Sequence, residues 1–138
     1  MMRALIDTNI ILDLLLEREP FVAEAQAIWR ANREGQFYGY VCAITPGTVF
    51  YVMRHETKSV EQARQLVTLL LQAFYTSAVD HAVLQRALQM EVPDFEDAIQ
   101  SASALAEGLD FIVTRDAKDY KNSPVTTITP ANFIKGLE

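Results

Sequence analysis

The chain has 138 residues, of which 12 are Lys or Arg and 18 are Asp or Glu, so its formal net charge is −6. Half of the residues are apolar, and this length and composition predict one folded domain over residues 1–138 rather than a disordered chain. A single cysteine, Cys42, excludes an internal disulfide and suits a reducing compartment. The acidic balance excludes binding to nucleic acid or membrane through bulk positive charge. A phosphate-bearing substrate therefore needs a few local basic residues or a bound cation.

The N-terminal stretch resembles a signal peptide only superficially. Arg3 precedes an apolar run, but Asp7 and Asp13 interrupt that run where a signal peptide is unbroken. The chain also has no segment that approaches the roughly 18 apolar residues needed to cross a bilayer. We therefore expect a cytoplasmic protein with no membrane partner.

Strand and helix signals alternate along the chain. Apolar and β-branched segments predict strands at residues 3–6, 37–42, 75–79, 111–114 and 126–128. Helical spacing of apolar residues predicts helices at residues 9–16, 21–32, 46 onward, 59–74, 81–89, 93–107 and 130 onward. Thr45, Ser59 with Gln62, and Asp80 are the predicted N-terminal caps, and Gly108 is a predicted stop. This alternation predicts an α/β fold with a parallel sheet covered on both faces.

Two acids follow predicted strands. Asp7 comes directly after the first strand in LIDTN, and Asp116 lies two residues after FIVT. The carboxyl ends of parallel strands meet at one edge of the sheet, where α/β proteins place their active sites. Asp7 is also compatible with a turn, and Asp116 lies in the polar loop TRDAKD, where an acid is unremarkable.

A third acidic group lies on the predicted helix PDFEDAIQSASALAEG. Asp94 and Asp97 are three residues apart, so they share a face on one flank of the predicted core stripe. The stripe is predicted to contain Phe95, Ile99, Ala102 and Ala106, with Ser101 beside the two aspartates and with Glu96, Gln100 and Glu107 on the opposite side. Acids at the edge of a buried stripe are costly, and a hard divalent cation compensates them. Asp94 equally suits a structural role as the N-terminal acid of the helix.

Three segments together resemble the PIN domain family, namely LIDTNIILD, PDFEDAIQSASALAEG and DFIVTRDAKDY. Their order and spacing extend the resemblance over the whole chain. It implies a three-layer α/β/α sandwich with a central parallel sheet, the metal-dependent nuclease fold of many prokaryotic toxin ribonucleases. It further implies that Asp7, Asp97 and Asp116 are the catalytic acids and bind Mg²⁺ or Mn²⁺, with Asp94 as a further ligand. We expect their carboxylates to converge beyond the strand ends, so that at least one has a raised pKa.

The resemblance covers the neighbours of these acids, with one departure. Thr8 and Asn9 match a supporting hydroxyl or amide of the first motif, and Thr114 matches the hydroxyl residue that precedes the last acid. The family commonly has a Glu near the start of its third helix, where CAITPGTVFYV has Thr48. Thr48 could hold a metal-bound water but supplies no charge, so a second cation is expected to bind more weakly. Asp94 could partly replace the missing acid.

The resemblance implies a Mg²⁺- or Mn²⁺-dependent endoribonuclease that hydrolyses RNA phosphodiester bonds, and the toxin of a toxin–antitoxin pair as its role. Arg115 is the best candidate for phosphate contact, with Lys118 and Lys121 beside it, unless all three belong to a solvated loop. One alternative is a degenerate PIN module that binds RNA or a protein partner without cutting, which Thr48 favours. A phosphatase resembling the haloacid dehalogenases is the other alternative, disfavoured because Asn9 stands where that motif has a second acid.

The sequence lacks the residue patterns of a zinc site, a cysteine nucleophile or a nucleotide-binding loop. His55 and His81 have no third ligand at zinc spacing, and Cys42 has no basic neighbour and is expected to be a small buried hydrophobe. Phosphate-cradling GxxxxGK and GxGxxG motifs are absent from the sequence.

The helix after Ser59 carries more apolar residues than one core face needs. Its predicted core stripe consists of Val60, Ala63, Val67, Leu70, Leu71 and Phe74, and the surplus consists of Leu66, Leu69 and Ala73. A homodimer through this helix would cover the surplus, and the family resemblance also implies a homodimer. Packing against the helix of Trp29 would cover it equally well.

Overall fold

The computed structural model describes residues 1–138 and is built around a five-stranded, entirely parallel sheet with strand order β3-β2-β1-β4-β5. The strands are β1 (Arg3–Ile6), β2 (Tyr38–Cys42), β3 (Tyr75–Ser77), β4 (Phe111–Val113) and β5 (Thr127–Ile128). The first strand in the sequence is the central one, with Leu5 in register with Tyr40 of β2 and with Ile112 of β4. The predicted parallel sheet is confirmed.

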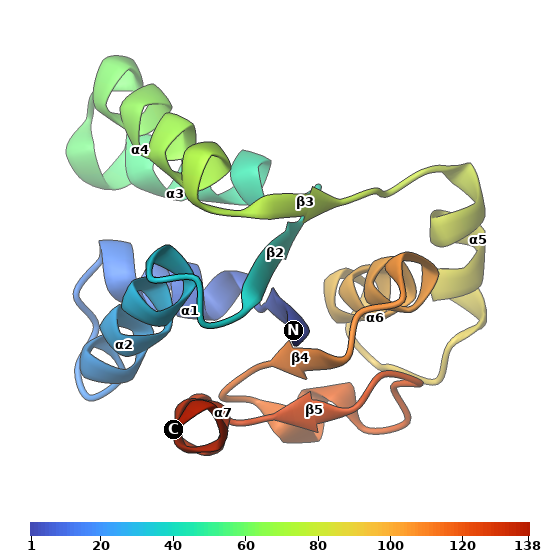
Figure 1. The fold of residues 1–138 in the computed structure, drawn as a ribbon. Coiled ribbons are helices and arrows are strands. Elements are labelled where there is room, and N and C mark those ends of the chain that lie inside the picture. Colours follow the sequence, from blue (N-terminus) through green and yellow to red (C-terminus); the bar gives the residue numbers. More distant parts are fainter.

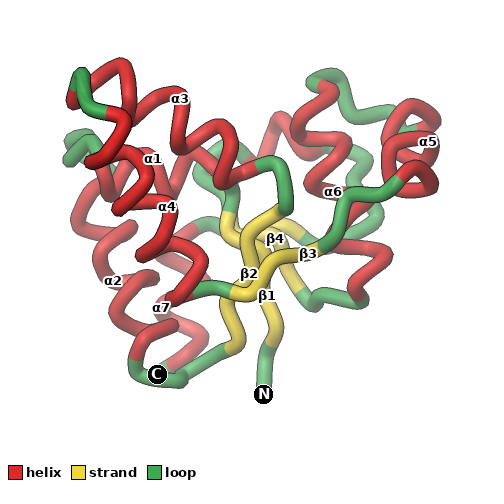
Figure 2. The backbone as a smooth tube through the Cα atoms, turned by 90° about the horizontal axis from the view of Figure 1, so that it is seen from above, coloured by secondary structure: helices red, strands yellow, loops and turns green.

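Helices cover both faces of this sheet (Figures 1 and 2). They are α1 (Thr8–Leu15), α2 (Val22–Arg33), α3 (Thr45–Thr57), α4 (Val60–Ala73), α5 (His81–Gln89), α6 (Phe95–Glu107) and α7 (Pro130–Leu137), with the short 3₁₀ helix η1 (Ala117–Tyr120) after β4. In Figure 2 the strands separate α1, α2, α3, α4 and α7 on one side from α5 and α6 on the other. None of these helices has the length and apolar character required to cross a bilayer.

The central strands send alternate side chains into two separate cores. Ala4 and Ile6 of β1 pack into the larger core, with Val113 of β4, against α1, α2 and α4. Leu5 and Ile112 point the other way, into the core formed with α5 and α6. Successive residues of a strand point to opposite faces, so a strand buried on both faces must be apolar throughout. This arrangement confirms the three-layer α/β/α sandwich.

Most of the predicted helix ends are confirmed. The Ser59 side chain accepts a hydrogen bond from the Gln62 N–H (3.1 Å), and Asp80 accepts one from the Val83 N–H (2.9 Å). Gly108 ends α6 in the left-handed conformation, at φ 72°. Thr45 is the exception, because Ile44 occupies the cap position and Thr45 is already helical. The buried Thr45 hydroxyl is instead used in a tertiary contact, a 2.8 Å hydrogen bond with the Thr8 hydroxyl.

The apolar surface of α4 differs from the predicted stripe. Ala63, Leu70 and Phe74 are buried as predicted, but Val60 and Leu71 are about half exposed, so their assignment to the core was wrong. Of the predicted surplus, Leu66 and Ala73 pack against the core, and Leu69 is exposed. Trp29 of α2 makes an edge-on contact with Phe74 at a ring-centroid distance of 5.2 Å. The neighbouring helix therefore covers part of this surface within one chain.

Gly39 of β2 lies where the backbone of the strand meets α2. Its N–H donates to the Asn32 side-chain oxygen (3.0 Å), and the Asn32 amide donates to the Ala73 carbonyl (2.7 Å). A Cβ atom on Gly39 would collide with the Asn32 side chain and lie 2.8 Å from Cδ1 of Phe74. Asn32 thus connects α2, β2 and the end of α4 only if residue 39 has no side chain.

We expect Gly39→Ala to lower the free energy of unfolding by about 1–3 kcal/mol, because the added methyl group forces the packed Asn32 and Phe74 side chains apart. Gly47→Ala is the matched control, because no atom lies within 4 Å of a Cβ added there and alanine favours the helix by about 1 kcal/mol. Urea unfolding followed by circular dichroism measures both. Equal stabilities of the two variants would contradict this account of Gly39.

Candidate active site

The acid after the first strand lies at the buried carboxyl edge of the sheet. Asp7 follows β1 directly, its N–H donates to the Val113 carbonyl of β4 (3.0 Å), and the residue is only 2% exposed. The pairing of β1 with β4 therefore places Asp7 next to Thr114 and Asp116, which lie 107 and 109 residues later in the chain. The structure brings these predicted site residues together because their strands are neighbours.

Thr114 connects two of the acids. Its hydroxyl donates to Oδ2 of Asp7 (2.8 Å) and accepts a hydrogen bond from the backbone N–H of Asp116 (3.0 Å). Burial raises the pKa of Asp7, and the hydrogen bonds from Thr114, Gln100 and the Asn9 backbone oppose that rise. The buried carboxylate is thus held by donors that fix its orientation.

Asp97 of α6 lies close enough to Asp7 to be affected by its charge. Burial is the largest cause of a rise in the pKa of Asp97 to about 7, followed by repulsion from Asp7 and from Asp94. The Tyr120 hydroxyl partly counteracts this rise. The charge of Asp116 in turn raises the pKa of Asp7. A raised pKa was predicted for such a group of acids, and it follows here from burial together with mutual repulsion.

The other two acids at the start of α6 face solvent. The Asp94 side chain caps the helix, accepting a hydrogen bond from the Asp97 N–H (3.1 Å), and it is exposed. This contact matches the structural role that the sequence left open for Asp94. Glu96 is exposed, in line with its predicted orientation.

Gln100 belongs to the site, although the sequence analysis placed it on the opposite, solvated side of the helix. It is 2% exposed, and its amide donates to Oδ1 of Asp7 (3.1 Å) and to the Tyr120 hydroxyl (2.9 Å). The prediction was wrong because η1, which carries Tyr120, packs against this face of α6. Gln100 is three residues after Asp97, and that spacing is the signal that could have placed it beside the acid.

Tyr120 is a further site residue that the sequence analysis missed. It is almost fully buried, and burial together with the charges of Asp7 and Asp97 raises the pKa of its hydroxyl. Tyr120 is therefore a neutral, buried hydroxyl beside the acids. The predicted core stripe of α6 needs a matching correction, since Ile99 and Ala102 are buried but Phe95 is 45% exposed and Ala106 is exposed. Phe95 lies in the first turn, beyond the cover that the sheet provides.

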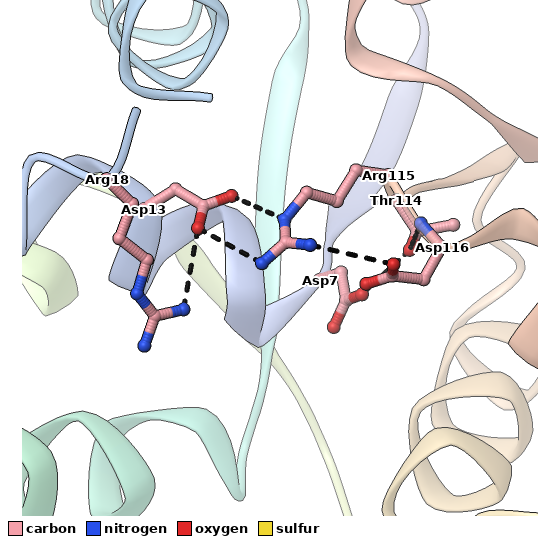
Figure 3. A network of polar contacts seen from close by, with 6 residues as sticks. All are labelled: Asp7, Asp13, Arg18, Thr114, Arg115 and Asp116. Atoms are coloured by element: carbon pink, nitrogen blue, oxygen red, sulfur yellow. Dashed lines mark hydrogen bonds and ion pairs between the residues drawn. The ribbon is translucent and has the colours of Figure 1, made fainter. Parts of the chain in front are cut away.

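Arg115 is held by an acid that the sequence analysis did not assign to the site. Its Nε donates to Oδ2 of Asp13 (2.8 Å) and its Nη2 to Oδ1 of Asp13 (3.3 Å), while Nη1 lies 3.6 Å from Oδ1 of Asp116. Figure 3 shows the guanidinium between the two carboxylates. Hydrogen bonding to Asp13 is the main cause of the raised pKa of Arg115. Because all three guanidinium nitrogens face carboxylates, direct phosphate contact by Arg115 stays a prediction.

Two of the predicted supporting threonines, Thr8 and Thr48, form hydrogen bonds with groups other than the acids. The Thr8 hydroxyl bonds to that of Thr45, which connects the edge of the sheet to the start of α3. Thr48 lies one turn further along α3, and its hydroxyl donates to the Ile44 carbonyl (3.4 Å). Lys118 and Lys121 are exposed on and just after η1.

The residues outside this site agree with their expected roles. Cys42 is fully buried in the core formed with α5 and α6, and burial raises the pKa of its thiol. His55 and His81 are exposed on α3 and α5, two separate helices.

The donors at this edge suit a hard divalent cation by their chemistry. Asp7, Asp97 and Asp116 offer carboxylate oxygens. Burial and mutual repulsion raise the pKa values of Asp7 and Asp97, and a cation would relieve that repulsion. No three His, Cys, Asp or Glu side chains are grouped closely enough to hold an ion together. The edge therefore fits a cation bound by one or two carboxylates and several waters, which is the usual arrangement for Mg²⁺.

The fold and its acid-lined edge place the chain in the PIN-like class of α/β/α sandwiches. A family model described as PIN domain matches residues 3–118. The chain therefore belongs to the PIN domain family.

Solved structures share this fold. A toxin–antitoxin complex from Klebsiella pneumoniae contains a chain 25% identical to this one, with 92% of this chain and 97% of that chain covered and a TM-score of 0.67. VapBC-1 from nontypeable Haemophilus influenzae is 16% identical, with 94% and 99% covered and a TM-score of 0.69. VapBC2 from Rickettsia felis, bound to a DNA fragment from its promoter, is 14% identical, with 93% and 98% covered and a TM-score of 0.66. No curated protein matches the chain in sequence.

The raised pKa of Asp97 predicts how the stability of the metal-free protein depends on pH. The folded protein holds the Asp97 proton up to about pH 7, whereas the unfolded chain releases it near pH 3.8. The contribution of Asp97 to stability is therefore full below pH 3.8 and is lost as the pH rises through 7, because between these values the unfolded state binds fewer protons than the folded state. We expect the free energy of unfolding to fall by about 1–2 kcal/mol between pH 5 and pH 8, allowing for solvent screening.

Asp97→Asn should remove most of this slope, and Glu96→Gln, at an exposed position on the same turn, should keep it. Urea unfolding in the presence of a chelator measures all three proteins at the two pH values. An Asp97→Asn variant with the wild-type slope would show that another group causes the dependence.

Proposed function

We propose that this protein is a metal-dependent endoribonuclease that hydrolyses RNA phosphodiester bonds, acting as the toxin of a toxin–antitoxin pair. One observation carries the proposal, namely the buried Asp7 carboxylate, oriented by Thr114 and Gln100 at an edge that also holds the charges of Asp97 and Asp116. Burying a repelling acid costs stability, so its presence is better explained by a ligand than by folding. Membership of the PIN family supports the nuclease class.

Asp7, Asp97 and Asp116 are the residues that would hold the cation, one or two of them directly and the rest through bound water, with Mg²⁺ or Mn²⁺ as the expected ion. When bound, such a cation activates a water and stabilises the charge that develops on the phosphoryl oxygens. Thr114 and Gln100 fix the Asp7 carboxylate, so it does not have to reorganise when it binds a ligand. The exposed Lys118 and Lys121 are the free cations nearest in sequence to Asp116 and are the better candidates for phosphate contact.

The expected partners are RNA and an antitoxin protein. Two of the structural neighbours are VapBC proteins and one is a toxin–antitoxin complex, which supports an antitoxin partner. A second copy of this chain is a further expected partner, and the exposed Val60, Leu69 and Leu71 on α4 are apolar surface that it could cover.

A non-cleaving PIN module is the second candidate. Thr48 favours it, because its hydroxyl is already used by the backbone and supplies no charge to the site. The pairing of Arg115 with Asp13 favours it too, because a phosphate finds no free guanidinium there.

Replacing Asp7 separates the two candidates. Asp7→Asn keeps the shape of the side chain but removes a ligand charge, and should reduce Mn²⁺-dependent RNA cleavage by at least about 100-fold. The free energy of unfolding of the metal-free variant should stay within about 1 kcal/mol of wild type. Burial disfavours the charged form of Asp7, so removing that charge offsets lost hydrogen bonding, and the Asn side chain keeps one acceptor oxygen for Gln100.

Cleavage is measured on labelled RNA with Mn²⁺, Mg²⁺ or a chelator, and stability by urea unfolding. Asp110→Asn is a matched control, because this exposed aspartate lies at the opposite end of the sheet, beside Arg3. Absence of metal-dependent cleavage by the wild type, together with a destabilised Asp7→Asn, would make Asp7 a structural residue.

Thr48→Glu tests whether the start of α3 faces the site. Thr48 is three residues after Thr45, which contacts Thr8, so a longer acidic side chain on that face can approach the acids. We expect the variant to bind Mn²⁺ about 10-fold more tightly than wild type, because a fourth carboxylate adds charge and an oxygen ligand. Isothermal titration calorimetry measures the change. Glu56→Gln is the control, because Glu56 is an exposed acid of the same helix, and this variant should leave the Mn²⁺ affinity unaltered.

A further inference from the structure

Asp13 is a buried acid that the proposed reaction does not use. It lies on α1, six residues after Asp7, and its side chain is 1% exposed. An unpaired carboxylate at this position would be strongly destabilising, so the identity of its partner matters. That partner is Arg115, whose Nε and Nη2 contact the two oxygens of Asp13 side by side (2.8 and 3.3 Å). Such a bidentate pair fixes the plane of the guanidinium as well as its distance.

Two further contacts restrict Arg115. The guanidinium carbon of Arg115 lies 4.0 Å from the ring centre of Phe21, so one face of the guanidinium makes a cation–π contact with this ring. The remaining nitrogen, Nη1, lies 3.6 Å from Oδ1 of Asp116, a long ion pair compared with the contacts to Asp13. Arg18 also reaches Asp13, but at 3.5 Å and with a side chain that is 37% exposed, so it is the weaker partner.

We propose that Asp13 is a positioning residue, which holds Arg115 in a side-on pair and so keeps the adjacent Asp116 carboxylate free to bind a cation. This inference rests on the proposed function, in which Asp116 is a metal ligand. Figure 3 shows the arrangement, with Arg115 between Asp13 and Asp116 and with Asp7 beside Asp116.

The charges account for this role. Arg115 and Asp116 are neighbours in sequence, and the 3.6 Å distance between Nη1 and Oδ1 places their side chains within reach of each other. With Asp13 in place, most of the Arg115 charge is neutralised on the side away from the site. Without Asp13, the nearest carboxylate for the guanidinium is Asp116, and a close pair there would compete with a cation for the same oxygens.

The experiment measures Mn²⁺ affinity in three variants, by electron paramagnetic resonance of the free ion and by calorimetry. Asp13→Asn should bind Mn²⁺ about 10-fold or more weakly than wild type, because the released Arg115 would pair with Asp116 and compete with the cation. Adding Arg115→Gln to Asp13→Asn should restore the affinity to within about 3-fold of wild type, since the competing cation is gone. Arg18→Gln is the matched control and should bind as wild type.

This result differs from that of a merely structural role, which would lower the unfolding temperature of Asp13→Asn but leave the Mn²⁺ affinity of the folded protein unchanged. Unchanged affinity would therefore overturn the proposal, as would a double variant that binds no better than Asp13→Asn. If Asp13→Asn does not fold, the double variant Asp13→Asn/Arg115→Gln tests the proposal instead, because it lacks both charges of the pair and leaves neither of them unpaired. Affinity of the double variant 10-fold below wild type would then reject the proposal.

A metal-free measurement keeps this inference separate from the proposed function. The ¹⁵Nε resonance of Arg115 should be insensitive to Asp116→Asn in the wild-type background, because Asp13 holds that nitrogen. In the Asp13→Asn background the same substitution should shift it clearly, because Arg115 has moved to Asp116. Wild-type protein that binds no Mn²⁺ would reject the proposed function, whereas equal shifts in the two backgrounds would reject the positioning role of Asp13.

Discussion

The negative charge of Asp7 has to be accommodated inside the protein, at the end of a strand that helices cover on both faces. The rest of the site follows from this constraint. Thr114 can donate to Asp7 because β4 pairs with β1, and Gln100 can donate because α6 crosses the same edge. Asp97 is partly buried and lies in the field of that charge, and both effects raise its pKa. The site is therefore a consequence of where parallel strands end, and of the donors placed around one carboxylate.

The sequence was sufficient for the features that depend on local chemistry. Strands that are apolar at every position, such as β4, indicate burial on both faces, and Ser59, Asp80 and Gly108 mark helix ends through bonds within one turn. The meeting of the acids at the strand ends could also be predicted, because parallel strands bring their carboxyl ends to the same edge of the sheet whatever the strand order. Family membership, matched over residues 3–118, agrees with the three short motifs that pointed to it.

The sequence was insufficient where a long-range contact decides the role of a side chain. Gln100 seemed solvated because nothing in its own helix shows that η1 will cover it with Tyr120. Thr45 seemed a cap because its partner Thr8 is 37 residues away, and Val60 and Leu71 seemed buried because helical spacing does not show how far a neighbouring helix extends. Asp13 looked like an interruption of an apolar run, and its significance lies in Arg115, 102 residues later.

That separation of 102 residues has a consequence for how the protein is made. When α1 leaves the ribosome, Asp13 has only Arg18, five residues further on, as a nearby cation. Arg115 is synthesised with the last quarter of the chain, and the β4 strand that stands beside Asp7 comes immediately before it. Pairings this distant in sequence form late, because closing the long loop costs entropy before the contact is made. We therefore expect Asp7 and Asp13 to lack these partners in an incomplete nascent chain, and the acidic edge of the sheet to form only once translation of the chain is nearly complete.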